Sequence, residues 1–451
     1  MNTPIYDFVS KYAESDVARF HMPGHKGERF LGCEDRDITE IKGADELYDA
    51  EGIIAESEKN ASELFGTAKT VFSTEGSSQC IRAMLHLVTM HRRPGERPVV
   101  VAARNAHKAF LYAAILLDFD VIWLWPEKTE SVCSCQISAE VLEETLKEAE
   151  KTHKNGPVAA VYITSPDYLG NQAEIAALAE VCHRFGTVLA VDNAHGAYLH
   201  FLETPCHPMD LGADICCDSA HKTLPVLTGG AYLHISKTAP ERFWKQAKQA
   251  MELFGSTSPS YMILQSLDLC NRYLSDGYRE RLAVTAAGVA EAKKQLAAAG
   301  WHCEYGEPLK ITVKAPCGLS GYELAEQLRA QKIECEYADA DFVVLMVTPE
   351  ISEKEFCHLV KAFGENKKRY EEKTYPVFSQ AEVVMPMRTA YFSQGKVLSA
   401  AEAEGKICRR PTASCPPAIP VVVPGERLDS TIVELLKYYK MDEIEVVAET
   451  E

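Results

Sequence analysis

The sequence has fewer basic than acidic residues, and this balance limits the partners that we expect. Its 451 residues include 47 lysines and arginines against 65 aspartates and glutamates, which gives a formal net charge of −18 at pH 7. Nucleic acids and anionic membrane surfaces both select basic protein surfaces, so we expect neither as a partner. A cationic substrate, by contrast, would be attracted to such a protein.

Membrane-spanning runs, a signal peptide and paired cysteine motifs are also missing. No apolar run approaches the ~20 residues of a membrane span, and the N-terminus lacks the basic start and apolar core of a secretory signal. The 15 cysteines are odd in number, and none forms the C-x-x-C pair of a zinc site. We therefore expect reduced thiols, no metal site and a cytoplasmic location. Apolar content of 46% and charged content of 25% are ordinary for a soluble globular enzyme.

The pattern of apolar segments predicts an α/β protein of two or three domains. Between about residues 60 and 235, apolar strands at 98–103, 158–164 and 187–194 alternate with helical segments. This rhythm indicates a mostly parallel sheet that is covered on both faces. After that comes a smaller α+β pattern, then a proline-rich tail that ends in a helix. We predict an N-terminal arm at 1–55, a large domain at 56–282, a small α+β domain at 283–370 and a C-terminal domain at 371–451.

Sheets of this kind bind ligands beyond the carboxyl ends of their strands, so the residues at the end of each predicted strand are informative. Gly76, Ser77 and Ser78 open a helix directly after the strand that ends near residue 73. Small residues let the backbone approach an anion, and the helix N-terminus supplies hydroxyl and N–H donors to a phosphate. The alternative is that these serines only cap the helix.

Three other strand ends carry single polar residues. His107 comes after the strand at 98–103, and Asp192 ends the strand that begins near residue 187. Lys222 lies between two apolar segments that look like buried strands, which is an unusual place for a lysine. Taken alone, the aspartate could be a helix cap or a metal ligand, and the lysine could cap a turn.

Together these residues match the needs of one ligand, pyridoxal 5′-phosphate (PLP). PLP requires a lysine that forms an imine with its aldehyde, a carboxylate at its pyridine nitrogen, a phosphate cup and a flat group over its ring. The carboxylate keeps the ring nitrogen protonated, which makes the ring an electron sink. The interval from Asp192 to Lys222 leaves room for one more strand and its connections.

With these residues, the chain resembles the PLP-dependent Orn/Lys/Arg decarboxylase family, major domain, in its short bacterial form. The resemblance implies the aspartate-aminotransferase-like PLP-dependent transferase fold and a homodimer with active sites at its interface. It also implies α-decarboxylation of lysine, arginine or ornithine to a diamine or polyamine, hence a role in polyamine biosynthesis. The matching segments are FHMPGHKG (20–27), DITEIKGADELYDAEGII (37–54), ELFGTAKTVFSTEGSS (63–78), RNAHKA (104–109), VDNAHGAYLHF (191–201), SAHKTLPVLTGGAYLH (219–234), FGSTSPSYMILQSLD (254–268) and PPAIPVVVPGE (416–426).

The resemblance also implies a role for each matching residue. Lys222 would form the imine, Asp192 would pair with the pyridinium nitrogen, and His107 would stack on the ring. Thr257 would reach the phosphate of the neighbouring subunit, unless it is only a helix cap within its own chain. Glu426 would lie near the amino end of the substrate. The other implied cofactor-binding residues are Gly76, Ser77, Ser78, Ala194, His195, Ser219 and His221.

Some positions depart from the family pattern and leave the substrate open. Asn193 stands where glutamate is more usual, and Ala418 stands where glycine is usual. An aminotransferase or lyase acting on an unusual basic amino acid is one alternative, but its expected carboxylate-binding arginine is absent from residues 309–320. A non-catalytic cofactor-binding protein is another alternative. The retention of Lys222, Asp192 and His107 together argues against it.

Overall fold

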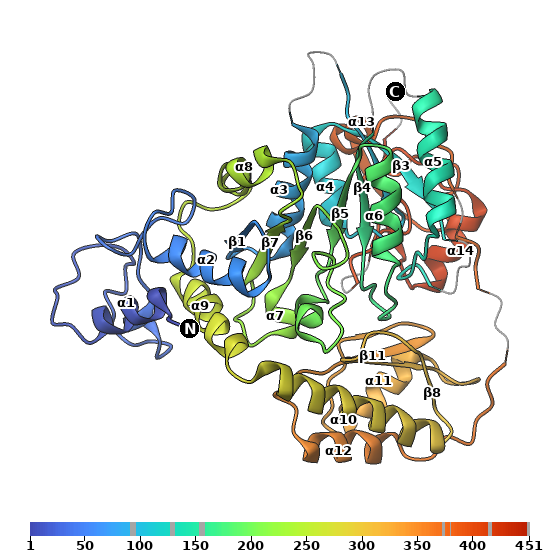
Figure 1. Ribbon diagram of the computed structural model, residues 1–451. Helices are drawn as coiled ribbons and strands as arrows, with labels where there is room; N and C mark the ends of the chain where they lie inside the picture. The colour runs from blue at the N-terminus through green and yellow to red at the C-terminus, as the bar shows by residue number, and fades with distance from the viewer. Residues whose placement is uncertain are drawn as a thin grey trace. The chain divides into compact units, whose positions relative to one another are not determined.

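A computed structural model of the protein describes residues 1–90, 96–126, 131–152, 158–371, 375–378, 380–413 and 417–448 (Figure 1). The chain divides into two compact units. The first unit comprises Met1–His91, Ala159–Tyr162 and Ile175–Arg281, and the second comprises Arg92–Val158, Ile163–Glu174 and Leu282–Glu451. The four-part division expected from the sequence stays a prediction. Among the described residues, no helix combines the length and the apolar character needed to cross a membrane.

The first unit is built on strands in the order β1-β7-β6-β5-β4. Their bounds are β1 (Lys69–Ser73), β7 (Ala231–Ile235), β6 (Ile215–Asp218), β5 (Val188–Asp192) and β4 (Val158–Thr164), of which 159–162 belong to this unit. β5 and β6 are parallel, whereas β7 pairs antiparallel with both β6 and β1. Every residue of β6 and β7 is buried. Their continuous apolar sequences are therefore those of strands that are covered on both faces.

Helices cover these strands and position the strand ends. α3 (Ser77–Thr89) packs on β6, β7 and α8 (Glu241–Glu252), while α6 (Ile175–Arg184) packs on β5. The short α7 (Ala220–Thr223) begins directly after β6, so Lys222 lies within one helical turn of the end of that strand. The remaining elements of this unit are α1 (Pro4–Ala13), η1 (Glu34–Arg36), α2 (Ile53–Leu64), η2 (Ala197–Phe201), α9 (Tyr261–Ser275) and the start of α10 (Tyr278–Ala298).

The second unit contains two small sheets and one parallel strand pair. β2 (Val99–Ala103) and β3 (Asp120–Leu124) are parallel, with α4 (Lys108–Leu117) between them in the chain. An antiparallel sheet has the order β10-β11-β9-β8, and β12 pairs with β13. The bounds of these strands are β8 (His302–Cys303), β9 (Lys310–Lys314), β10 (Tyr337–Ala338), β11 (Phe342–Met346), β12 (Gly395–Ser399) and β13 (Glu443–Val447). The other helices of this unit are α5 (Ala139–Thr152), α11 (Gly321–Ala330), α12 (Glu353–Phe363), α13 (Met387–Phe392) and α14 (Ser430–Tyr438).

Two apolar cores stabilise the second unit. One lies between the four-stranded sheet and its helices, and it includes Ile311, Val343 and Leu296. The other joins residues near 132 to the C-terminal segment and includes Cys133 and Leu436. The C-terminal segment is therefore an integral part of this unit.

The fully buried carboxylate of Asp218 ties the carboxyl ends of β5 and β6 together in the first unit. Asp218 accepts hydrogen bonds from Asn193 Nδ2 at 2.6 Å, from His207 Nε2 at 3.0 Å and from His234 Nε2 at 3.1 Å. His234 in turn contacts the hydroxyl of Thr70, its cross-strand partner, at 2.8 Å. The donors surround the carboxylate, so its charge is satisfied without water.

Asp218 and His234 have pKa values that suit this arrangement. Burial alone would raise the pKa of Asp218, but attraction and hydrogen bonds from His207 and His234 outweigh it and hold that pKa well below its ordinary range. Burial lowers the pKa of His234, despite the opposing attraction of Asp218. The network therefore consists of an ionised aspartate and, at His234, a neutral imidazole that donates its Nε2 proton.

The neutral state of His234 predicts a loss of stability in mild acid. An unfolded histidine takes up a proton below about pH 6.5, whereas His234 in the folded protein has a lowered pKa and stays neutral. Each pH unit of acidification below that point therefore lowers the free energy of unfolding by up to about 1.4 kcal/mol. His234→Gln keeps a donor for Asp218 and an acceptor for Thr70 but does not titrate. Urea denaturation should therefore show a smaller loss of unfolding free energy between pH 7 and pH 5 in this variant than in the wild type.

His302→Gln is the matched control, because the side chain of His302 is 54% exposed. This control should lose as much stability as the wild type over the same pH interval. If His234→Gln lost as much unfolding free energy as the wild type between pH 7 and pH 5, His234 would not be the residue whose protonation destabilises the fold.

Candidate active site

The residues predicted to form a phosphate cup lie where the first unit brings the N-terminus of α3 close to the start of α7. Gly76 precedes α3 with φ 73°, a conformation that glycine adopts without strain, and its N–H donates to the carbonyl of Gly229 at 2.7 Å. The hydroxyl of Ser219 donates to the hydroxyl of Ser77 at 2.8 Å. These two serines therefore meet at the N-terminus of α3, where the first backbone N–H groups have no partner within the helix.

The remaining predicted members of the cup lie next to these serines in the chain. Ser78 is the second residue of α3 and is half-buried. His221 Nδ1 contacts the carbonyl of Gly230 at 3.1 Å, so Nδ1 carries a proton and the ring is held in one orientation. A Cβ built on Gly76 would meet no atom within 4 Å, which shows open space in front of the helix.

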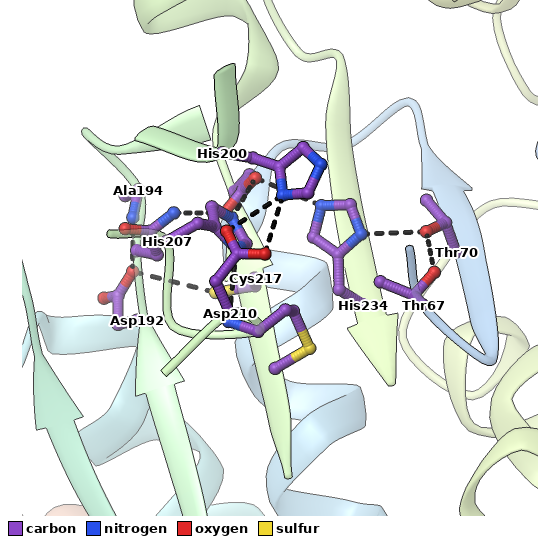
Figure 2. Close-up of polar contacts among 12 residues, drawn as sticks. Thr67, Thr70, Asp192, Ala194, His200, His207, Asp210, Cys217 and His234 are labelled. Atoms are coloured by element: carbon purple, nitrogen blue, oxygen red, sulfur yellow. Dashed lines mark hydrogen bonds and ion pairs between the residues drawn. The ribbon is translucent and has the colours of Figure 1, made fainter. Parts of the chain in front are cut away.

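Asp192 lies at the end of β5 and is only 2% exposed. Its carboxylate accepts hydrogen bonds from the Tyr162 hydroxyl at 3.1 Å and from the backbone N–H of Ala194 at 3.2 Å. The thiol of Cys217 also donates to it, at 3.7 Å (Figure 2). Burial raises the pKa of Asp192, and the positive charge of Lys222 opposes this rise. A cation beside Asp192 would therefore stabilise its ionised form.

Lys222 lies in α7 and is half-buried. Its Nζ is 2.9 Å from Nε2 of His195, which is itself buried. His195 belongs to the turn after β5, two residues beyond Asn193. The sequence predicted His195 to bind the cofactor, but it gave no sign that His195 would contact the lysine.

The cluster around Asp218 also places three possible metal ligands within 4.8 Å of one another, namely His207, Cys216 and Asp218. Nδ1 of His207, however, accepts a hydrogen bond from the backbone N–H of Met209 at 3.2 Å. The ring proton must then reside on Nε2, which leaves no lone pair there for a metal. Burial also raises the pKa of the Cys216 thiol well above its ordinary value. The geometry favours a hydrogen-bonded carboxylate over a metal centre.

Two of the predicted site residues belong to the second unit. His107 caps the N-terminus of α4, where its Nδ1 accepts from the backbone N–H of Ala109 at 3.1 Å. Glu426 is 2% exposed, and its Oε2 accepts from the backbone N–H of Val423 at 2.9 Å. Burial raises the pKa of Glu426, and the charge of Arg104 lowers it.

Arg104 is an ion-pair partner of Glu426 that the sequence did not predict. Its Nη2 lies 3.6 Å from Glu426 Oε2, and its guanidinium donates to the carbonyls of Pro420 and Val421. The rings of Trp123, Trp125 and Phe378 surround the guanidinium at 5.0 to 5.3 Å. Glu426 Oε1 is buried and has no hydrogen-bond partner among the described residues.

Thr257 lies in the loop between α8 and α9 and is exposed. The loop is held in place by its neighbour Ser256, whose backbone N–H donates to Glu75 at 2.5 Å. The cap of α9 is Ser260, which accepts from the N–H of Ile263 at 3.4 Å. Thr257 is therefore not the cap of this helix.

Comparisons with known proteins identify the family and the fold of the chain. The family model of the Orn/Lys/Arg decarboxylase major domain matches residues 3–317. The arginine decarboxylase of Bacillus subtilis (strain 168) is 28% identical over 94% of this chain and 91% of its own length. Lysine decarboxylase A from Pseudomonas aeruginosa superposes with a TM-score of 0.84 at 18% identity, over 99% of this chain and 80% of its own.

A more distant solved structure, the serine palmitoyltransferase of Sphingomonas wittichii, has a TM-score of 0.56 at 13% identity over 80% of this chain and 82% of its own. These structural likenesses confirm the predicted α/β, PLP-dependent transferase fold. The match of the family model, which covers well over half of the sequence, confirms the predicted family. The chain belongs to the Orn/Lys/Arg decarboxylase family, major domain.

Proposed function

We propose that this protein uses PLP to remove the α-carboxyl group of a basic amino acid, namely lysine, arginine or ornithine. The observation that carries the proposal is the presence of Lys222 in the first unit close enough to the buried Asp192 for their charges to interact. The amine lies in α7 and is electrostatically coupled to a buried carboxylate at the end of β5. The family of the chain catalyses this class of reaction.

The residues of the first unit fit the cofactor at both of its ends. The open space before α3 and the paired hydroxyls of Ser77 and Ser219 suit a phosphate, which accepts hydrogen bonds from N–H and O–H donors. The raised pKa of Asp192 suits a partner that carries a positive charge, such as a protonated pyridine nitrogen. Gly76, Ser78 and His221 would complete the phosphate cup.

Each residue then has a defined task. Lys222 would supply the amine that holds the cofactor aldehyde and would later release the product amine. Asp192 would hold the proton on the pyridine nitrogen, and Ala194 would lie against one face of the ring. The stacking role of His107, a residue of the second unit, stays a prediction. When bound, PLP supplies the electron sink that accepts the electron pair left on Cα as carbon dioxide departs.

Glu426 is proposed to recognise the distal cationic group of the substrate. Its Oε2 is occupied by Val423 and Arg104, but Oε1 is a buried acceptor without a described partner. A substrate N–H donor would satisfy that oxygen and remove the cost of leaving it unpaired. The excess of acidic over basic residues in the chain also favours the binding of a cationic substrate.

A homodimer and a cytoplasmic location complete the proposal. Segment 15–32 exposes several large apolar side chains, which a second copy of the chain would cover: Phe20, Met22, Phe30 and Leu31 are 97%, 69%, 80% and 90% exposed. Every cysteine that the structure describes is a free thiol, which supports a reducing compartment.

The products formed from a panel of basic amino acids test the reaction. The purified protein, loaded with PLP, should convert one of lysine, arginine or ornithine to cadaverine, agmatine or putrescine, identified by mass spectrometry. Lys222→Ala should form none of them. Formation of a keto acid instead would favour the aminotransferase alternative and would refute decarboxylation.

Removing the charge of Asp192 should leave the fold intact and disable the chemistry. Asp192→Asn preserves the shape of the side chain but cannot hold a proton on the pyridine nitrogen, so we expect turnover to fall by about 10³-fold, on the order of 4 kcal/mol. PLP affinity should fall as well. Asp210→Asn is a control, because Asp210 pairs with His200 at 2.9 Å rather than with the lysine. Near-normal turnover of Asp192→Asn at full PLP occupancy would exclude the proposed role.

Thr257 tests whether each site needs two chains. A hydroxyl-to-phosphate hydrogen bond contributes roughly 1.5–3 kcal/mol, so Thr257→Ala should weaken PLP binding about ten- to a hundredfold. Mixing inactive Lys222→Ala with a severely impaired Thr257→Asp variant should restore part of the activity, because one site of the mixed dimer has both residues intact.

The alternative is that Thr257 serves the phosphate cup of its own chain. The contact between Ser256 and Glu75, which is next to Gly76, gives this alternative a structural basis. In that case each defect stays within its own subunit, and mixing restores nothing.

A further inference from the structure

Nζ of Lys222, which is half-buried, lies 2.9 Å from Nε2 of His195, which is buried. A lysine ammonium has three N–H donors and no lone pair, so the ring nitrogen of His195 accepts whenever the lysine is charged. If the proton moves to Nε2, the direction of the bond reverses and the lysine amine becomes the acceptor. The pair can therefore hold one proton at either nitrogen without changing its geometry.

The position of His195 is fixed by its turn rather than by the lysine. The N–H of Gly196 donates to the carbonyl of Asn193 at 2.8 Å, and the N–H of Asn193 donates to the carbonyl of Cys217 at 2.9 Å. Asn193 Nδ2 is bound to the buried carboxylate of Asp218. A side chain on Gly196 would collide with the amide of Asn193, so the turn closes tightly at this point.

Other titratable groups near the pair have their own partners. Asp192 accepts from Tyr162, from the N–H of Ala194 and from Cys217. Burial raises the pKa of the Cys217 thiol well above its ordinary value, so it stays protonated. His221, next to Lys222 in α7, is bound to the carbonyl of Gly230 through Nδ1. The ring of His195 places a basic nitrogen within hydrogen-bond distance of the Lys222 amine.

We propose that His195 is the proton acceptor of Lys222. An ammonium group cannot attack a carbonyl carbon, because its nitrogen lone pair is already bonded to a proton. In the step that we assign, the N–H bond of the Lys222 ammonium breaks and its electron pair stays on Nζ. The proton forms a new N–H bond at Nε2 of His195, and it returns to the lysine when the amine is displaced. This inference rests on the proposed function, in which Lys222 is the attachment site of PLP.

The experiment measures covalent attachment of PLP to the apo-protein, and not turnover. PLP is added to wild-type apo-protein and to His195→Gln, the product is trapped with borohydride at timed intervals, and the labelled peptide is quantified by mass spectrometry. Glutamine keeps a hydrogen-bond acceptor for Lys222 but cannot take up its proton. General-base assistance typically contributes 10²- to 10⁴-fold, so the variant should attach PLP about 100-fold more slowly at pH 7.

The pH dependence separates proton transfer from a structural role. In the variant only the deprotonated fraction of Lys222 reacts, so the rate should rise about tenfold per pH unit towards the ordinary lysine pKa near 10. The wild-type rate should rise less steeply between about pH 6.5 and 8.5, where a neutral imidazole is available. The ratio of the two rates at each pH cancels the titration of PLP itself. A ratio close to one, or one that does not change with pH, would overturn the proposal.

Three further variants make the outcome unambiguous. His183→Gln changes another histidine of the first unit, one that pairs with Asp214 at 3.2 Å, and it should attach PLP at the wild-type rate. His195→Ala leaves space for added imidazole, which should restore the rate if the ring acts as a base. This variant also serves if His195→Gln does not fold. No rescue of folded His195→Ala by imidazole would count against the proposal.

Failure of the inference and failure of the proposed function give different results. Lys222→Ala, the third variant, should trap no PLP on the peptide that contains position 222. If the wild-type label lies on another lysine, the proposed function fails. If the label lies on Lys222 but His195→Gln attaches PLP as the wild type does, only the role of His195 fails.

Discussion

A carboxylate that is shielded from water must be surrounded by donors, and Asp218 meets this requirement with three side-chain donors. Asn193, His207 and His234 come from three separate segments of the first unit, and all three donate to the same carboxylate. Removing one partner of such a buried charge typically costs about 3–5 kcal/mol, so the ends of β5 and β6 are held with little freedom. The turn that carries His195, and the start of α7 that carries Lys222, both leave from this fixed point.

Asp192 and Asp218 end neighbouring parallel strands and are both buried, yet their pKa values shift in opposite directions. The difference comes from their partners. Asp218 is surrounded by two histidines and an amide that satisfy its charge, whereas Asp192 receives a phenol, one backbone N–H and a thiol. Burial therefore dominates at Asp192. A buried carboxylate with a raised pKa is strongly stabilised in its ionised form when a cation is placed beside it. This property suits a residue that is assigned to pair with a pyridinium nitrogen.

The sequence predicted the fold class and the order of Gly76, Asp192 and Lys222, because these come from apolar periodicity and from the residues that stand at strand ends. The family was predicted from the resemblance of the matching segments. It did not predict the network around Asp218, although Asp218 and His234 stand out as polar residues within apolar strands. Thr70 and His234 are 164 residues apart in the chain, and only the antiparallel pairing of β1 with β7 brings them together. The alternative that Thr257 only caps a helix is contradicted, because Ser260 caps α9, while the predicted contact of Thr257 with a phosphate stays a prediction. Side-chain pairs of this kind depend on register and rotamer, which a single sequence does not specify.

Asn193, a departure from the family pattern, has a physical explanation in this network. Its amide donates to Asp218 at 2.6 Å, a task that an ionised glutamate could not perform because it has no proton to donate. A glutamate at position 193 would instead place a second negative charge beside the first. An ionised Asp218 therefore requires a hydrogen-bond donor at position 193, and the side-chain amide of Asn193 supplies one. Through the N–H of Asn193 and the closed turn after it, this match also sets the place of His195. Position 193 therefore helps to fix the place of the residue that we propose as the proton acceptor of Lys222.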